Sequence, residues 1–260
     1  MTGTASLEAV PVLHARGVEK HFGDHHVLKG VNAEVRPGEV VCVLGANGSG
    51  KSTFLRCAIH LIEPDAGHVE LCGVDLAAKK GAELRAARRR AAMVFQQVLL
   101  VRRRSALANV AFGALGELPL WRSASERLFP EEVMQRSHDA LRRVGLPQVA
   151  YQRADRLSGG QAQRVAIARA LCQRARIILA DEPVASLDPR AADAVLALLA
   201  DVAHSEGLGV LVVLHQPELA RKYSDRVIGL LEGTMVFNRP PNDVDDSEIA
   251  LLYRNERDDD

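Results

Sequence analysis

The sequence predicts an α/β fold built on a parallel sheet, and three patterns along the chain support this prediction. Short apolar runs at residues 40–44, 177–180 and 210–214 are followed by glycine, acidic or histidine residues, as expected where buried strands end. Helical patterns precede the two later runs, and such β–α alternation is typical of a parallel sheet covered by helices on both faces. Residues 98–160 show helical patterning without a convincing strand, which indicates a helical insertion.

The N-terminal region is predicted to form a small antiparallel sheet. Residues 10–14, 31–35 and 69–71 are short runs bounded by turn residues, which indicates short strands. The run at residues 40–44 is apolar and partly β-branched, so it is instead predicted to be a buried strand of the main sheet. The predicted helices of the main sheet are, in chain order, residues 162–172 and 191–204.

The composition is that of a globular protein without a dominant charge. The 260 residues include 33 Lys+Arg and 33 Asp+Glu, so the formal net charge is zero and nucleic acid is not an expected partner. The longest uncharged stretch has twelve residues, 105–116, whereas a membrane-spanning helix needs about 20. The N-terminus has no signal-peptide pattern, so we expect a cytosolic chain. Neither a disulfide nor a zinc site is predicted for the cysteines, which are Cys42, Cys57, Cys72 and Cys172.

Charge is unevenly distributed along the chain. Residues 77–104 contain nine Lys or Arg and one acid, Glu83, which predicts a solvated helix face, with contact to a partner or to anionic lipid as the alternative. Residues 243–260 contain eight acids and two arginines. We therefore expect residues 241–260 to form a frayed acidic tail.

A glycine-rich loop, Gly45-Ala46-Asn47-Gly48-Ser49-Gly50-Lys51-Ser52, fits the pattern G-x-x-x-x-G-K-[ST]. It follows a predicted strand and opens an apolar helical segment that extends to Leu61. The loop's backbone N–H groups can converge on phosphate oxygens, while Lys51 neutralises the β and γ phosphates and the Ser52 hydroxyl can bind Mg²⁺. The loop predicts binding of a nucleoside triphosphate, such as ATP, with Mg²⁺. The residues predicted to contact the nucleotide are Gly45, Ala46, Asn47, Gly48, Ser49, Gly50, Lys51, Ser52 and Thr53.

Two carboxylates follow the apolar run at residues 177–180. Ligands of open α/β sheets bind where strands end, so Asp181 and Glu182 are candidates for the catalytic site. Asp181 is predicted to hold Mg²⁺, and Glu182 is predicted to orient and polarise the attacking water. The bland alternative is a strand-end acid that caps the next turn.

The pentapeptide Leu157-Ser158-Gly159-Gly160-Gln161 precedes the predicted helix at residues 162–172. Ser158 suits a helix N-cap, and the two glycines leave backbone N–H groups open for an anion. LSGGQ placed between the glycine-rich loop and the Asp-Glu pair resembles the ATP-binding cassette (ABC) ATPases. The resemblance spans residues 11–240 and implies a P-loop NTPase core of the RecA-like type, an antiparallel β subdomain and a helical subdomain at about residues 98–160.

The same resemblance implies a head-to-tail dimer and roles for further residues. In that family Ser158, Gly159, Gly160 and Gln161 act on the γ-phosphate bound by the partner chain. Gln96 resembles the Q-loop glutamine that reaches the metal and the attacking water, with an exposed loop amide as the alternative. The remaining matches, each with its alternative, are Asp188 at the dimer interface or as an ordinary helix N-cap, His215 as the γ-phosphate switch or as a structural histidine, and Phe22 stacked on adenine or buried in the sheet.

A finer resemblance is to the ATP-binding subunits of phosphonate importers. The matching residues are Phe95-Gln96-Gln97, Asn109-Val110, Gly113-Ala114-Leu115-Gly116, Trp121-Arg122, Pro183-Val184-Ala185-Ser186-Leu187-Asp188-Pro189, Leu214-His215-Gln216 and Leu252-Tyr253-Arg254. The chain departs from that pattern in Val101-Arg102-Arg103-Arg104 and in Pro217. Both departures concern possible docking or switch surfaces.

The resemblance implies uptake of a phosphonate or a related phosphorus oxyanion, driven by ATP hydrolysis with Mg²⁺. The implied partners are a second ATPase chain, two integral-membrane permease subunits and, indirectly, a solute-binding protein, which would place the chain at the cytoplasmic face of the membrane. The alternatives are an importer ATPase for another small solute, or a soluble ABC ATPase of an enzyme or nucleic-acid complex. A nucleic-acid role predicts a long insertion or coiled coil, and the sequence has no such segment.

Overall fold

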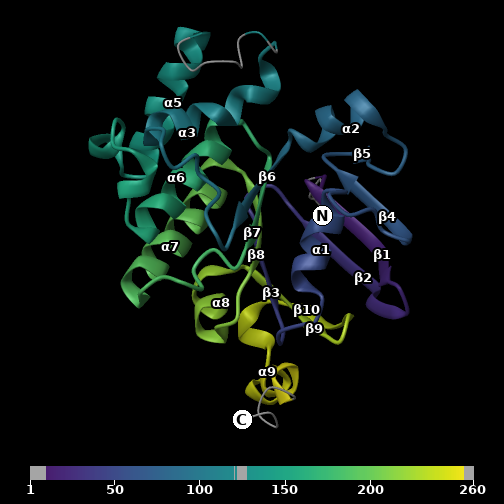
Figure 1. Cartoon of the computed structure of the whole chain (residues 1–260). Coiled ribbons are helices and arrows are strands. Elements are labelled where there is room, and N and C mark those ends of the chain that lie inside the picture. The colour runs from purple at the N-terminus through teal and green to yellow at the C-terminus, as the bar shows by residue number, and fades with distance from the viewer. Residues whose placement is uncertain (1–9, 120, 122–127, 255–260) are drawn as a thin grey trace, which may run out of the picture.

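The computed structural model describes residues 10–119, 121 and 128–254 and contains two sheets and a group of helices (Figure 1). Arg122 and residues 255–260, which entered the predictions above, lie outside the described residues. The strands are β1 (Leu13–Phe22), β2 (His25–Val35), β3 (Val40–Leu44), β4 (Ala66–Leu71), β5 (Val74–Asp75), β6 (Ala91–Phe95), β7 (Ile177–Asp181), β8 (Gly209–Val213), β9 (Arg226–Leu231) and β10 (Thr234–Arg239). The helices are α1 (Lys51–Ala58), α2 (Gly81–Arg88), α3 (Ala106–Ala111), α5 (Glu131–Arg143), α6 (Gly159–Cys172), α7 (Pro189–Glu206), α8 (Pro217–Tyr223) and α9 (Asp246–Leu252), with 3-10 turns η1 (Phe112–Glu117), η3 (Pro147–Val149), η4 (Ala154–Arg156) and η5 (Pro241–Asp243).

The larger sheet has six strands in the order β10-β9-β3-β8-β7-β6. The five strands from β9 to β6 are parallel, and β10 pairs antiparallel with β9 at the edge. Because successive side chains point to opposite faces of a strand, Cys42 of β3 packs in one hydrophobic core while its neighbours Val41 and Val43 pack in the other. The sheet is therefore buried on both faces, as its continuous apolar strands predict.

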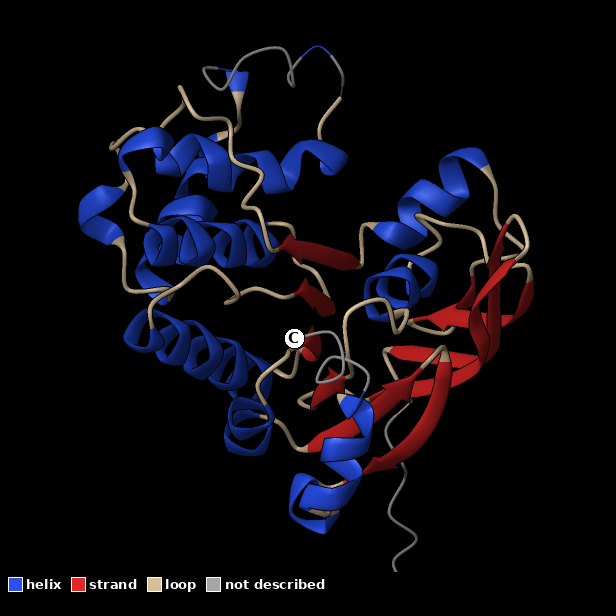
Figure 2. Cartoon of the chain, turned by 60° about the horizontal axis from the view of Figure 1, so that its bottom comes forward, coloured by secondary structure: helices blue, strands red, loops and turns tan. Residues whose placement is uncertain are grey.

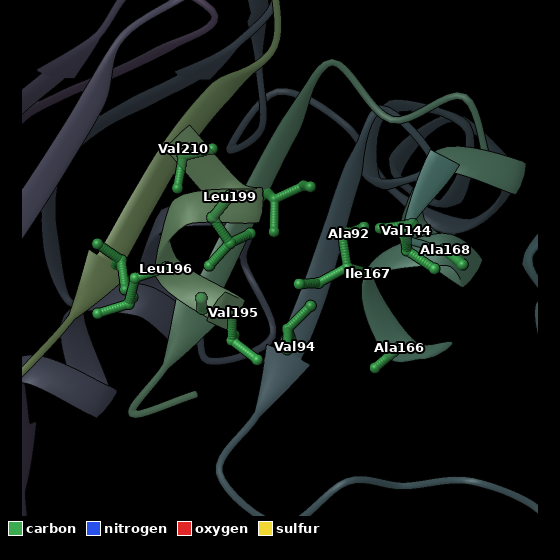
Figure 3. Close-up of a cluster of buried hydrophobic side chains, with 14 of the residues drawn as sticks. Ala92, Val94, Val144, Ala166, Ile167, Ala168, Val195, Leu196, Leu199 and Val210 are labelled. Carbon is green, nitrogen blue, oxygen red and sulfur yellow. The ribbon is translucent and has the colours of Figure 1, made fainter. Parts of the chain in front are cut away.

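Helices cover one face of this sheet, and α1 with the four-stranded sheet covers the other (Figure 2). In the close-up of the helical side, Ile167 of α6 lies beside Ala92 and Val94 of β6, and Leu199 of α7 lies near Val210 of β8 (Figure 3). Fully burying an aliphatic side chain of this kind stabilises the fold by about 1.5–3 kcal/mol. These contacts fix α6 directly against the strand that leads to Gln96.

The N-terminal strands form an antiparallel sheet in the order β2-β1-β4-β5, as predicted, but β1 and β2 are longer than expected. β1 begins at Leu13 and runs to Phe22, and its pairing with β2 continues through an irregularity between Ala15 and Val18. The irregularity interrupts the alternation of apolar and polar residues, so the apolar run of the sequence marks only the start of the strand.

The end of α1 and the C-terminal segment also differ from the predictions. α1 ends at Ala58 instead of reaching Leu61, because His60 adopts a left-handed φ of 53° and the Arg88 guanidinium binds the carbonyl oxygen of Ile59 at 3.0 Å. The frayed acidic tail is wrong for residues 241–254, which form η5 and α9. α9 begins with a capping box and buries Ile249 and Leu252, so apolar contacts outweigh the charge of this segment.

Between residues 98 and 160 the described part of the chain holds α3, η1, α5, η3 and η4 and no strand, only an isolated bridge between Ser105 and Arg153. η1 lies directly on α6, since a Cβ at Gly113 would come within 2.3 Å of the Arg169 carbonyl oxygen. Within the basic segment, α2 buries only Ala87; Arg85 is exposed, whereas Arg88 is half-buried and donates to the Ile59 carbonyl oxygen. The domain boundaries given above stay predictions.

Candidate active site

The glycine-rich loop connects β3 to α1 at the carboxyl end of the sheet. Gly45 has φ 156°, and a Cβ there would lie 2.3 Å from the Leu230 carbonyl oxygen, so no larger residue fits. Gly50 has φ 100° at the N-cap of α1, a left-handed conformation that favours glycine. The backbone can therefore wrap closely around an anion at the positive end of the helix.

Lys51 is 4% exposed, and its ammonium group lies inside the loop. Nζ donates hydrogen bonds to the carbonyl oxygens of Gly45 and Ala46, both at 2.7 Å. A buried ammonium needs such acceptors in the absence of an anion. The arrangement keeps a positive charge where a phosphate can bind.

Ser52 and Asp181, the residues predicted to bind Mg²⁺, lie side by side next to the loop. The Ser52 hydroxyl donates to Asp181 Oδ1 at 2.8 Å, and Asp181 is 7% exposed at the end of β7. Hydroxyl and carboxylate oxygens are the hard ligands that Mg²⁺ prefers, so this donor pair fits that ion. Arg56, one turn further along α1, lies 4.0 Å from Asp181 Oδ2.

Glu182 and His215 form the second polar pair of the site. His215 Nε2 lies 2.6 Å from Glu182 Oε1, which brings together the ends of β7 and β8. Glu182 has a left-handed φ of 49°, an uncommon conformation that costs a residue other than glycine about 1–3 kcal/mol; His60, Cys72, Arg174 and Glu232 share it outside this site. Its side chain lines a cavity of about 340 Å³ together with loop residues from Asn47 to Thr53. The carboxylate is thus within the same cavity as the phosphate-binding loop.

Residues 157–161, here called the signature turn, form a separate group. Ser158 Oγ accepts a hydrogen bond from the Gln161 backbone N–H at 3.3 Å, and Gln161 Oε1 accepts one from the Ser158 N–H at 3.0 Å, which makes a capping box at the start of α6. A Cβ at Gly159 would lie 2.9 Å from Leu187 Cδ2, so the turn packs on the loop before α7. Asp188 caps α7 by accepting a hydrogen bond from the Ala191 N–H at 2.9 Å.

Two predicted residues, Gln96 and Phe22, are exposed. Gln96 follows β6 directly and Phe22 ends β1 with 51% of its surface exposed, so the alternative that Phe22 is buried in the sheet is wrong. Lys20 Nζ lies 5.6 Å from the Phe22 ring centre. An exposed ring at the end of a strand remains open for stacking on a base.

The contacts of two further residues of this region were not predicted. Val27 of β2 adds an apolar wall to the cavity of the glycine-rich loop. Asn109 is fully buried and holds the segment after Gln96 through hydrogen bonds to the Val101 N–H at 2.7 Å and the Ser105 carbonyl oxygen at 2.9 Å. Val27 carries no sequence signal, whereas a lone asparagine within an apolar helix was a signal for a buried polar contact.

Comparison with known proteins decides the family. The family described as ABC transporter matches residues 28–185, and a phosphonates import ATP-binding protein of Frankia casuarinae is 48% identical over 239 residues, covering 92% of this chain and 94% of the relative. The chain belongs to the ABC transporter family. A phosphonates import ATP-binding protein of Escherichia coli O157:H7 is 43% identical over 242 residues, covering 91% of this chain and 92% of the relative.

Solved structures agree with this ABC transporter assignment. The ADP conformation of an ATP-binding cassette of an ABC transporter superposes with a TM-score of 0.83 at 26% identity, covering 95% of this chain and 99% of that one. A dimeric cassette in a post-hydrolysis state, bound to ADP and Pi, gives a TM-score of 0.74 at 34% identity, covering 88% and 98%. The predicted fold class is confirmed, and the chain is an ATPase of the ABC transporter family. Within the described residues no helix combines the length and the apolar character needed to cross a bilayer.

Proposed function

We propose that this chain is the ATP-binding subunit of an importer of phosphonates or a related phosphorus oxyanion. The observation that carries the proposal is identity of 48% and 43% to phosphonates import ATP-binding proteins over more than nine tenths of both chains. An ATPase subunit does not itself contact the transported solute, so support for the solute comes from these relatives and support for hydrolysis comes from the site.

In the proposed mechanism the glycine-rich loop and Lys51 hold the phosphates of ATP, and Phe22 stacks on the adenine. Ser52 and Asp181, with Gln96, hold Mg²⁺; when bound, this ion supplies positive charge that stabilises the transferring phosphoryl group. Glu182 orients the attacking water and accepts its proton.

His215 contributes a hydrogen bond to the γ-phosphate while its ring stays beside Glu182. Their 2.6 Å contact supports this role, because it places the ring at the site; a neutral imidazole has one N–H donor, so the Nε2–H that bonds Glu182 would pass to the γ-phosphate when ATP binds. Glu182 lines the cavity of the loop. Both residues lie at the ends of neighbouring parallel strands, where open α/β sheets bind ligands.

The proposed assembly has two copies of this chain under two membrane subunits at the cytoplasmic face, served by a solute-binding protein. Ser158, Gly159, Gly160 and Gln161 of one copy act on the ATP of the other, and Asp188 crosses between the copies. The dimeric cassette bound to ADP and Pi supports the pairing. No nucleic acid is included among the partners.

The test is uptake of labelled phosphonate by cells that lack this chain, complemented with the natural sequence or with Glu182→Gln. We expect the natural sequence to restore uptake and the variant to be inactive. Glu132→Gln, a change in an exposed carboxylate on α5, is the matched control and should restore uptake. Uptake that does not depend on any of these chains would refute phosphonate as the solute and leave the ATPase assignment in place.

A further inference from the structure

Two polar side chains of α6 hold the main chain on both sides of Gln96. Gln163 Nε2 donates to the Phe95 carbonyl oxygen at 3.4 Å, and Arg169 Nη1 donates to the Leu99 carbonyl oxygen at 2.7 Å. Gln96 itself is exposed between these anchors. The loop that presents Gln96 is therefore bonded at its start and at its end to one helix.

The burial of Gln163 and Arg169 indicates that their polar groups serve more than packing. Gln163 is 1% exposed, and the Arg169 guanidinium is half-buried, where loss of hydration lowers the pKa of Arg169. Within the described part of the chain, no carboxylate offsets the burial of Arg169. Burying a cation without a carboxylate is costly, so an apolar side chain would serve packing at this position better.

The helix that carries these donors begins at the signature turn. Gln163 is two residues beyond Gln161, and Arg169 follows about 12 Å from Gln161 at 1.5 Å per residue. Between the two donors, Ile167 packs on Ala92 and Val94 of β6 (Figure 3). A displacement of the signature turn along or around α6 would therefore reach both anchors without a flexible joint.

We propose that Gln163 and Arg169 are positioning residues that make the signature turn and the Gln96 loop move as one unit. The inference rests on the proposed function, in which Ser158 to Gln161 act on the partner's ATP and Gln96 serves the chain's own site. Docking of a partner's γ-phosphate at the start of α6 then sets the position of Gln96 in the neighbouring site. The two ATP sites of the dimer are coupled through this helix.

Gln173 provides a matched control at the other end of the same helix. Its side chain also donates to main-chain carbonyl oxygens, those of Ala91 at 2.8 Å and Arg89 at 3.0 Å, but these lie at the start of β6, away from Gln96. Removal of this donor costs the fold similar hydrogen bonds and leaves the Gln96 loop anchored.

The experiment compares the natural chain with Arg169→Met, Arg169→Lys, Gln163→Met and Gln173→Met in steady-state ATP hydrolysis and thermal unfolding. For Arg169→Met we expect kcat to fall about tenfold, KM for ATP to stay within about twofold, and the Hill coefficient for ATP to fall toward one. Arg169→Lys, which keeps a donor in reach, should recover at least about half of kcat. Gln163→Met should change kcat in the same direction.

The Gln173→Met control should lower Tm as much as Arg169→Met while keeping the kcat and Hill coefficient of the natural chain. Equal kcat losses in Gln173→Met and Arg169→Met would overturn the inference, as would unchanged kcat in Arg169→Met. If Arg169→Met does not fold, Gln163→Met against Gln173→Met decides by the same criterion. A natural chain without ATPase activity would instead refute the proposed function, which keeps the two failures distinct.

Discussion

The glycine-rich loop and the signature turn can both bind an anion, but only the first is built to do so within one chain. Lys51 is buried in the loop and bonded to two of its carbonyl oxygens, and Ser52 is bonded to Asp181 from another strand. Ser158 is exposed, and Gln161 of its own turn occupies both its hydroxyl and its backbone N–H. The glycine-rich loop is one half of the proposed site and is preorganised for nucleotide. The signature turn is the other half, and in the single chain it is a capped helix end.

The largest expected effect is that of Glu182→Gln, which should stop ATP hydrolysis while the two halves of the site still meet in the dimer. Glu182→Gln removes the proton acceptor but keeps the shape of the side chain, so turnover should fall by about 100-fold or more while ATP binding is retained. With Mg-ATP the variant should sediment as a dimer, because the nucleotide that joins the two chains is no longer consumed. A monomer of this variant that still hydrolyses ATP would contradict the proposed role of Glu182.

A smaller effect should separate the two halves. Ser158→Asp keeps an N-cap of equal quality for α6 but directs a carboxylate at the partner's phosphates. In the Glu182→Gln background we expect the ATP-dependent dimer to be lost, with nucleotide binding by the monomer unchanged within about twofold.

Ser105→Asp is the control for this substitution, because Ser105 caps α3 in the same way, accepting a hydrogen bond from the Ala108 N–H at 3.1 Å outside the proposed site. It should leave the dimer intact. A dimer that persists in Ser158→Asp would show that the signature turn is only a helix cap.

The smallest expected effect concerns the residues next to Phe22, where the adenine base is proposed to bind. Asp65 accepts hydrogen bonds from Lys20 Nζ at 2.6 Å and from the His21 N–H at 2.5 Å, and the Lys20 ammonium lowers the pKa of Asp65 to about 2. Asp65 thereby holds Lys20, whose Nζ lies 5.6 Å from the Phe22 ring centre. Asp65→Asn keeps a hydrogen-bond acceptor but loses the charge that holds Lys20 beside this ring. Because exposed ion pairs contribute little, KM for ATP should rise only about twofold, with kcat unchanged.

The same carboxylate predicts a direction with pH. Because its pKa is depressed in the folded chain, the stabilisation by Asp65 is present above the ordinary aspartate pKa and is lost as pH falls from about 4 toward 2. The natural chain and Asp65→Asn should therefore differ in Tm at neutral pH and converge at low pH. A difference that grows on acidification would exclude this account.

The parts of the fold that the sequence predicted are those with a local signal. The buried strand Val40–Leu44 is apolar throughout, and the helix after the signature turn begins at a serine N-cap followed by two glycines. The length of β1 could not be predicted because its alternation breaks at an irregularity that only pairing with β2 and β4 resolves. α9 did have a signal, Asp245 followed three residues later by Glu248, which the acidic composition of the segment obscured.

The candidate site shows the same division. The glycine pattern placed Lys51 and Ser52 in the phosphate-binding loop, and order along the chain singled out Asp181, Glu182 and His215, but their contacts depend on the sheet order. Gln163 and Arg169 were missed because they bond main-chain carbonyl oxygens, which every residue has, so the sequence does not mark the residues that accept these bonds. The catalytic and binding roles of the predicted site residues stay predictions until the variants above are measured.

The hydrogen bonds along α6 also restrict how this chain can vary in length. A helix turns by about 100° per residue, so inserting or deleting one residue between Gln163 and Arg169 would rotate Arg169 away from the Leu99 carbonyl oxygen and bring Ile167 out of the core. Substitutions in α6 can be compensated one at a time, but a change of register cannot. We therefore expect natural insertions in the helical region to fall in its loops, and chimeras that exchange signature turns between relatives to need the whole of α6.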